Sequence, residues 1–165
     1  FRIKTNKAEY DCRAVLLAIG RRGSPRQLGV PGEELPKVAY RLIDPEQYRN
    51  QHVLVVGGGD SALEAATSIA EEPGTTVTLS YRSGAFSRAK QKNREKIEMM
   101  NIAKKINVVL NSTVAEIAQD TVSITFEDKT EKIKNDAVIV SAGGILPTKF
   151  LQTIGITVET KWGTE

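Results

Sequence analysis

Apolar and polar positions along this chain follow two periodicities, which together predict an α/β fold. Four short apolar runs predict buried strands, at residues 53–56, 76–80, 107–110 and 137–140. Helix-forming stretches separate the first three runs, one at 60–71 and the other at about 88–103. Because strands that alternate with helices form parallel sheets, we predict a parallel sheet with helices packed on it.

Alternating positions and breaker residues organise the rest of the chain. Residues 113–118 and 121–127 alternate like two strands of a hairpin, so we expect a β-meander beside the parallel sheet. Residues 13–19 predict a short buried strand that ends at Gly20. Glycines and prolines crowd the segment 21–36, which predicts a linker or crossover rather than a regular element.

The stretch from Val53 to Ala66 is the most specific signal, because a glycine cluster joins an apolar strand to a helix. Gly57, Gly59 and Ala62 have the G-x-G-x-x-A spacing of the dinucleotide-binding turn in Rossmann-like folds. Gly57 permits the tight exit from the strand, Gly59 lets the backbone approach a diphosphate, and Ala62 lets the helix pack closely.

The start of the predicted helix completes this site. Asp60 or Ser61 is placed to cap the helix, whose free N–H groups and positive dipole end favour a phosphate. We therefore assign the diphosphate of a bound dinucleotide to consecutive residues at this turn: Gly57, Gly58, Gly59, Asp60, Ser61 and Ala62.

Basic residues after the second strand indicate which dinucleotide binds. NAD-binding folds of this kind place an acidic residue about 20 positions after the first glycine, where it binds the ribose 2′-hydroxyl. No acidic residue lies between Glu72 and Glu95, and Arg82 and Arg88 occur there instead. Guanidinium groups bind a phosphate through two hydrogen bonds, so we predict NADP(H), with Lys90 as a further phosphate partner.

Composition and charge argue against several classes of function. The net charge of +3 is mild and its basic residues gather around 82–105, which favours one anionic pocket over nucleic acid. No apolar run approaches the roughly 18 residues of a membrane span. The single cysteine, Cys12, leaves no disulfide or redox pair, so we expect a reducing, cytoplasmic setting. We expect no metal site, since His52 has no partner pattern, and we can name no catalytic acid, base or nucleophile.

Several of these segments resemble one known family. The run Gly57-Gly58-Gly59-Asp60-Ser61-Ala62-Leu63-Glu64 is similar to the second dinucleotide fingerprint of FAD-dependent pyridine nucleotide-disulfide oxidoreductases, especially thioredoxin reductase-like proteins. Tyr81-Arg82 and then Phe86-Ser87-Arg88-Ala89 resemble that family's 2′-phosphate segment. The resemblance covers nearly the whole chain, and it implies NADP(H) as a cofactor here and FAD in the parent protein.

The resemblance also suggests how the chain is divided. Residues 1–20 look like a strand remnant of an FAD domain, and 148–165 look like the border of that domain or a tail. Between them, 21–50 is expected as the linker or crossover and 51–147 as the NADP(H)-binding domain. Because the chain begins at Phe1, we expect it to be an excerpt of a longer protein, and we expect no FAD on this part alone.

Two departures narrow the resemblance. Thioredoxin reductases carry a Cys-x-x-Cys pair just before the fingerprint, where this chain has Tyr40-Arg41-Leu42-Ile43-Asp44-Pro45. Since thiol–disulfide exchange needs a thiolate, the resemblance points to relatives without the pair, such as thioredoxin reductase-like ferredoxin–NADP reductases and bacillithiol-disulfide-reductase-like proteins. Ser83 also stands where the second arginine of the phosphate segment usually lies, which weakens the preference for NADPH.

Three residues have two interpretations each. Tyr81 either stacks on the adenine or packs at the end of its strand. Glu64 either orients the nicotinamide, as in the relatives, or only interacts favourably with the positive end of the helix dipole. Gly143 either lines the nicotinamide pocket or is a turn glycine.

The leading hypothesis is the NADPH-binding domain of a flavoprotein that passes a hydride from NADPH to FAD and electrons to a separate acceptor. A redox protein is the candidate acceptor and a homodimer the candidate assembly. The alternative is a non-catalytic NADP-sensing module that regulates a partner. A flavin-free dehydrogenase is disfavoured, because neither Tyr48 nor Tyr81 has a lysine four residues further on.

Overall fold

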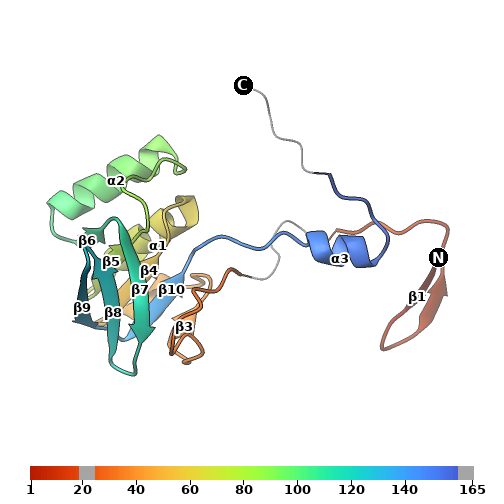
Figure 1. The fold of residues 1–165 in the computed structure, drawn as a ribbon, viewed down its shortest axis with the longest axis horizontal. Helices are drawn as coiled ribbons and strands as arrows, with labels where there is room; N and C mark the ends of the chain where they lie inside the picture. The colour runs from red at the N-terminus through yellow and green to blue at the C-terminus, as the bar shows by residue number, and fades with distance from the viewer. Residues whose placement is uncertain (19–24, 160–165) are drawn as a thin grey trace. The chain divides into compact units, whose positions relative to one another are not determined.

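The computed structural model describes residues 1–18 and 25–159, which divide into two units (Figure 1). The larger unit, Pro25–Gly143, holds a five-stranded parallel sheet, helices α1 and α2, and a three-stranded antiparallel sheet. The smaller unit combines the described parts of Phe1–Ser24 and Gly144–Glu165. The predicted α/β fold, with its parallel sheet and meander, is confirmed.

The parallel sheet has the strand order β3-β10-β4-β5-β6, and all its neighbouring pairs are parallel. Its strands are β3 (Val38–Ala39), β4 (His52–Val56), β5 (Thr76–Ser80), β6 (Ile106–Val109) and β10 (Ala137–Val140). The chain adds β5 and β6 on one side of β4 and returns to the other side with β10. This reversal makes a switch point between β4 and β10, where sheets of this kind bind ligands at the carboxyl ends of the strands.

Both faces of the parallel sheet are covered. Helices α1 (Asp60–Ala70) and α2 (Gln91–Ile102) share one apolar core with Val53 and Val55 of β4. Leu54, between those two valines, belongs to a second core on the opposite face. Strand β4 is thus buried on both sides, which explains its continuous apolar run.

The second core lies between the parallel sheet and an antiparallel meander. The meander consists of β7 (Ser112–Ile117), β8 (Thr121–Phe126) and β9 (Lys129–Lys134). The hairpin predicted at 113–118 and 121–127 corresponds to β7 and β8. The sequence did not predict β9, because its residues are mostly charged and exposed and carry little apolar signal.

The segment expected to be a linker is partly regular where it is described. It contains a short 3-10 helix, η1 (Pro45–Tyr48), and β3, which pairs with β10 in the parallel sheet. The Pro31 carbonyl also accepts a hydrogen bond from the Ile117 N–H at 2.9 Å, which ties this segment to β7. Both elements lie beyond 21–36, the stretch for which no regular element was expected, and the described residues 25–36 contain no helix or strand.

The carboxylate of Glu33 orders the start of that segment. It accepts hydrogen bonds from the N–H groups of Leu28 at 2.6 Å and Gly29 at 2.7 Å, and from the Tyr40 hydroxyl at 3.0 Å. Burial by itself would raise the pKa of Glu33, but these hydrogen bonds outweigh it and hold the pKa below its ordinary value. The glycine and proline content of the segment does not indicate this ordered loop, because its hydrogen bonds all depend on the one carboxylate of Glu33.

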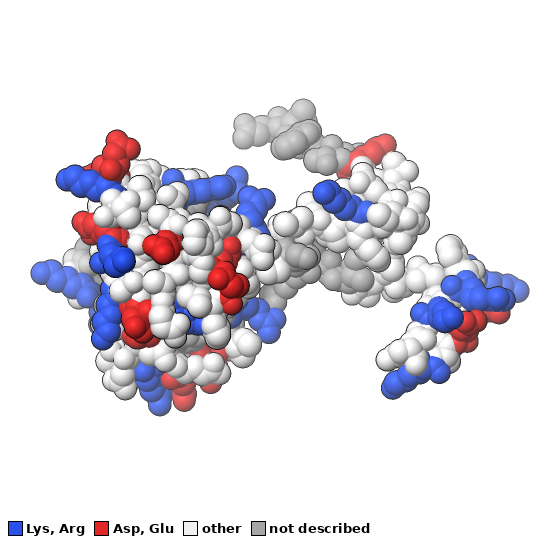
Figure 2. Space-filling model, turned by 60° about the horizontal axis from the view of Figure 1, so that its bottom comes forward, with Lys and Arg blue, Asp and Glu red and all other residues white. Residues whose placement is uncertain are grey.

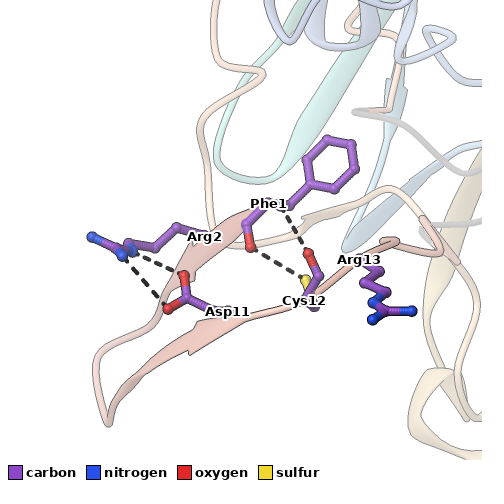
Figure 3. Close-up of a pocket in the computed structure, with 5 residues that line it drawn as sticks. All are labelled: Phe1, Arg2, Asp11, Cys12 and Arg13. Carbon is purple, nitrogen blue, oxygen red and sulfur yellow. Dashed lines mark hydrogen bonds and ion pairs between the residues drawn. The ribbon is translucent and has the colours of Figure 1, made fainter.

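In the smaller unit, β1 (Arg2–Lys4) and β2 (Glu9–Asp11) form an antiparallel hairpin. Figure 3 shows its open end, where the Phe1 ammonium donates to the Cys12 carbonyl at 2.8 Å and Arg2 pairs with Asp11 at 3.0 Å. Helix α3 (Thr148–Thr153) lies in the same unit.

The strand predicted at 13–19 is wrong for its described part. Residues 13–18 form no strand and are exposed, since no strand in the described ranges lies beside them to complete the hydrogen bonds. Ile19 and Gly20 lie outside the described residues. The assignment of the flanking segments to an FAD domain stays a prediction. No helix among residues 1–18 and 25–159 is long and apolar enough to cross a membrane.

Candidate functional site

The turn after β4 lies at the switch point of the parallel sheet. Gly57 has φ +148°, and its N–H donates to the Ser80 carbonyl at 3.0 Å. A Cβ on Gly57 would lie 2.5 Å from the Ser141 carbonyl oxygen, just beyond β10, and 2.9 Å from the Cβ of Ala62. Gly57 is therefore required by the close approach of the β10 exit and of α1, and the fully buried Ala62 is small for the same reason.

Gly59, two residues further on, faces open space. A Cβ added there would have no heavy atom within 4 Å, in contrast to Gly57. A Cβ on Gly58 would overlap the aromatic ring of Tyr81, which covers this part of the turn. The middle of the turn is thus covered by an aromatic side chain, and the backbone at Gly59 is left accessible.

The predicted side-chain cap of α1 is wrong. Gly59 is the N-cap residue, and no side-chain hydrogen bond caps the helix. The carboxylate of Asp60 instead accepts hydrogen bonds from the Lys90 N–H at 2.8 Å and from the Asn93 amide at 2.7 Å. The bond from Lys90 is the main reason that the pKa of Asp60 lies below its ordinary value.

The start of α1 consequently presents a row of free donors. The N–H groups of Gly58, Gly59, Asp60 and Ser61 have no hydrogen-bond acceptor among the residues that the structure describes. The first N–H groups of a helix need an external partner, and together with the helix dipole they favour an anion. This arrangement fits the diphosphate of a dinucleotide.

The loop between β5 and α2 carries the predicted phosphate-binding arginines. Helix α2 begins at Gln91 rather than near 88, so Arg88 and Lys90 belong to the loop. Arg82, Arg88 and Lys90 are exposed, and no carboxylate in the described ranges forms an ion pair with either arginine. Both guanidinium groups therefore keep their hydrogen-bond donors for another partner.

Tyr81 opens this loop and packs within it. Its ring stacks on the ring of Phe86, with centroids 5.4 Å apart and planes inclined by 16°. Its N–H donates to the Val109 carbonyl at 3.0 Å, at the end of β6. These contacts support the packing interpretation, and a contact between Tyr81 and adenine stays a prediction.

Glu64 and Asn93 lie on the facing sides of α1 and α2. The Asn93 amide donates to Glu64 at 3.0 Å and is buried, whereas Glu64 is exposed. Sequence reasoning missed Asn93, because its partner Asp60 lies 33 positions away and no local pattern links the two. The role of Glu64 toward the nicotinamide stays a prediction.

Gly143 follows β10 on the other side of the switch point. Its φ is +87°, its carbonyl accepts a hydrogen bond from the Arg26 N–H at 3.0 Å, and a Cβ there would meet open space. The positive φ fits a turn glycine, and the open space beside it also leaves room for a ligand.

The opposite, amino end of the sheet corrects the interpretation of His52. Its ring Nδ1 lies 3.0 Å from the Asp136 carboxylate, a partner 84 positions away that the sequence did not indicate. No group of His, Cys, Asp and Glu within the described part of the chain is arranged to hold a metal ion. Over the face of the larger unit seen in Figure 2, basic and acidic side chains are interspersed.

Comparison with known proteins places this geometry in a family. The family model for pyridine nucleotide-disulphide oxidoreductases matches residues 1–164. The chain belongs to this family. Its members use FAD and a nicotinamide dinucleotide.

Curated relatives from the family are similar over most of the chain. The ferredoxin–NADP reductase of Ignicoccus hospitalis is 31% identical over 156 residues, which cover 93% of this chain and 50% of that protein. The bacilliredoxin reductase Bdr of Bacillus subtilis is 30% identical over 165 residues, which cover 99% of this chain and 51% of that protein. The chain therefore spans about half the length of these relatives.

Solved structures agree with the fold. The bacillithiol disulfide reductase Bdr of Staphylococcus aureus superposes with a TM-score of 0.89 at 31% identity, over 97% of this chain and 50% of that one. Thioredoxin reductase of Lactococcus lactis superposes with a TM-score of 0.81 at 26% identity, over 98% of this chain and 55% of that one. The resemblance drawn from the glycine and arginine segments is confirmed.

Proposed function

We propose that this chain is the NADPH-binding domain of a flavin-dependent oxidoreductase. The parent enzyme takes a hydride, two electrons with one proton, from NADPH onto FAD and passes the electrons to a separate acceptor. The observation that carries the proposal is the row of N–H groups at the start of α1 that have no acceptor among residues 1–18 and 25–159. This row lies where a doubly wound sheet binds the diphosphate of a dinucleotide.

The preference for NADPH rests on the β5–α2 loop. No acidic side chain follows β5 to bind a ribose 2′-hydroxyl, and the exposed Arg82 and Arg88 have no described carboxylate partner. A phosphate is the partner that two free guanidinium groups bind best, and a 2′-phosphate distinguishes NADPH from NADH. The names of the ferredoxin–NADP reductase relatives support the same cofactor.

The acceptor is proposed to lie outside this chain. The chain has a single cysteine, Cys12, so it cannot form within itself the dithiol pair that a thioredoxin reductase uses. Reductases for ferredoxin and for bacilliredoxin are among the relatives, and both names indicate a redox protein as partner. We propose a partner of that class, with FAD held mainly by residues outside this chain.

Calorimetric titration with NADPH and NADH tests the proposal. We expect the wild-type chain to bind NADPH more tightly than NADH, and Arg82→Glu to weaken NADPH by about 30-fold, because a charge-assisted contact is lost and a like charge is added. NADH binding should change by less than about threefold, because the diphosphate contacts remain.

Arg94→Glu is the matched control, since it makes the same charge change at an exposed position of α2. It should change NADPH binding much less than Arg82→Glu. Equal losses for the two nucleotides would reject the 2′-phosphate role of Arg82. A wild-type chain that binds neither nucleotide would reject the proposed function, and tightly bound yellow flavin would contradict the division of FAD binding.

A further inference from the structure

Asn93 is a buried polar side chain whose hydrogen bonds join two helices. It lies in the first turn of α2 with 9% of its surface exposed. Its amide Nδ2 donates to the Asp60 carboxylate at 2.7 Å and to the Glu64 carboxylate at 3.0 Å. A primary amide has two N–H donors, so these two bonds use its full donor capacity.

The two acceptors lie next to the glycine turn. Asp60 and Glu64 are four residues apart at the start of α1, so their side chains share one face of the helix. The Oδ1 atom of Asp60 that binds Asn93 also accepts the Lys90 N–H at 2.8 Å. The Asp60 carboxylate, beside the diphosphate turn, therefore binds both Lys90, the last residue of the loop that carries Arg82 and Arg88 (the arginine loop), and Asn93 in the first turn of α2.

The other end of the arginine loop is also held against the turn. The Tyr81 ring covers Gly58 and stacks on Phe86, and the Phe86 carbonyl accepts the Ala89 N–H at 3.1 Å. The buried Ala89 belongs to the same apolar core as α1. Arg82 and Arg88 thus lie between two fixed points, and Asn93 with Asp60 makes the second of them.

We propose that Asn93 is a positioning residue for cofactor discrimination. It holds the start of α2 on α1, and thereby sets the distance between the guanidinium of Arg88 and the diphosphate turn at Gly59. This inference rests on the proposed function, since it assumes that one dinucleotide engages both features. Asn93 acts through Asp60 and Lys90 and does not itself contact the nucleotide.

The chemistry of the amide explains why other residues would fail here. Alanine would leave the two carboxylates of Asp60 and Glu64 without their shared donor. Aspartate would put a third carboxylate beside them, and like charges at this distance repel. Each change loosens α2 from α1 and lets Arg88 move relative to Gly59.

The experiment compares Asn93→Ala and Asn93→Asp with the wild-type chain by calorimetry. The probes are NADPH, NADH and adenosine 2′,5′-bisphosphate, which carries the 2′-phosphate without a nicotinamide. We expect Asn93→Ala to weaken NADPH and the bisphosphate by about tenfold, because Arg88 then loses its charge-assisted contact with the 2′-phosphate. Asn93→Asp should weaken them further, and NADH should change by less than about twofold with either variant.

Asn135→Ala is the matched control for loss of folding. Asn135 is also buried and its amide also donates to two acceptors, but these are backbone carbonyls at the amino end of the sheet. Both alanine variants should lower the thermal midpoint, and only Asn93→Ala should change the ratio of NADPH to NADH affinity. In an Arg88→Ala background, Asn93→Ala should have little further effect on NADPH.

The possible outcomes distinguish a failure of this inference from a failure of the proposed function. If the wild-type chain prefers NADPH and Asn93→Ala weakens both nucleotides equally or neither, the positioning role is overturned and the function stands. Additive losses from Asn93→Ala and Arg88→Ala would also overturn it. A wild-type chain that binds neither nucleotide nor the bisphosphate overturns both proposals.

Discussion

The two ends of the parallel sheet use a buried asparagine in the same way and have opposite surroundings. At the amino end, the Asn135 amide donates to the carbonyls of His52 at 3.2 Å and Ala137 at 2.7 Å. The backbone carbonyl of Asn135 accepts from the Lys37 ammonium at 3.0 Å. At the carboxyl end, Asn93 likewise joins two groups, but the N–H donors beside it at the start of α1 have no described partner.

The comparison separates structural polar groups from binding groups. At the amino end, the Asp136 carboxylate accepts the His52 N–H at 2.7 Å and lies 3.0 Å from the His52 ring Nδ1, so these groups pair with one another. The side-chain Oδ1 of Asn135 is the exception, since it is buried and has no partner among the described residues. At the carboxyl end, buried groups are bonded while backbone donors and arginines remain open. The first N–H groups of a helix need an external partner, so the donors at the start of α1 that have no described partner fit an anionic ligand at the carboxyl end.

The largest contrast is expected from the same substitution at Gly57 and Gly59, two glycines of one turn. Gly57→Ala should lower the free energy of unfolding by about 2–3 kcal/mol, because its Cβ would collide with backbone at a positive φ. Gly59→Ala should cost less than about 1 kcal/mol and weaken NADPH by about tenfold or more, since its Cβ points into the space open to a diphosphate. Urea unfolding and calorimetry measure the two effects. If Gly59→Ala binds NADPH as tightly as the wild-type chain, the proposal that the diphosphate binds at this turn is wrong.

An intermediate effect is expected at the closed end. Asn135→Ala should lower the free energy of unfolding by about 2 kcal/mol, because the carbonyls of His52 and Ala137 lose a buried donor. NADPH affinity, measured on the folded variant, should stay within about twofold of wild type. A selective loss of NADPH binding would break the distinction between the two ends.

The smallest effect is the acid dependence that both ends share. Hydrogen bonds from the Lys90 N–H and the His52 N–H are the main causes that lower the pKa values of Asp60 and Asp136 from 3.8. A carboxylate with a lowered pKa stabilises the fold fully above about 3.8, and this stabilisation is lost as the pH falls through the lower folded value. Urea unfolding between pH 5 and pH 3 should therefore show a declining free energy, and Asp136→Asn should show a shallower decline. An identical decline in that variant would exclude Asp136 as a contributor.

Some of the fold and of the site could be predicted because the signals are local. The apolar run of β4, the glycine spacing and the small Ala62 of α1 lie within one short stretch, and each follows from residue types. Arg82 and Arg88 could be named as candidate phosphate-binding residues because the loop after β5 contains basic residues and no carboxylate, and both features can be read from residue types. Helix α2 begins later than predicted, at Gln91, and its N-cap residue Lys90 makes no side-chain cap that would mark this start in the sequence.

The rest depended on partners far away in the sequence. The ordered loop at Glu33, the pairing of β3 with β10 and the contact of His52 with Asp136 join segments that no periodicity connects. The reverse error occurred at residues 13–18, whose apolar composition favours a strand although none of the described strands pairs with them.

The sequence by itself determined the order of β4, α1, β5, α2, β6, β7, β8 and β10, the dinucleotide turn and the basic character of the loop after β5. These properties depend on residue type and spacing, which are local quantities. Only the tertiary structure decided that Asp60 binds Asn93 and Lys90 rather than capping its own helix, and that Gly57 is closed while Gly59 is open. Such choices depend on which atoms of other segments come within hydrogen-bonding or contact distance, and packing alone sets those distances.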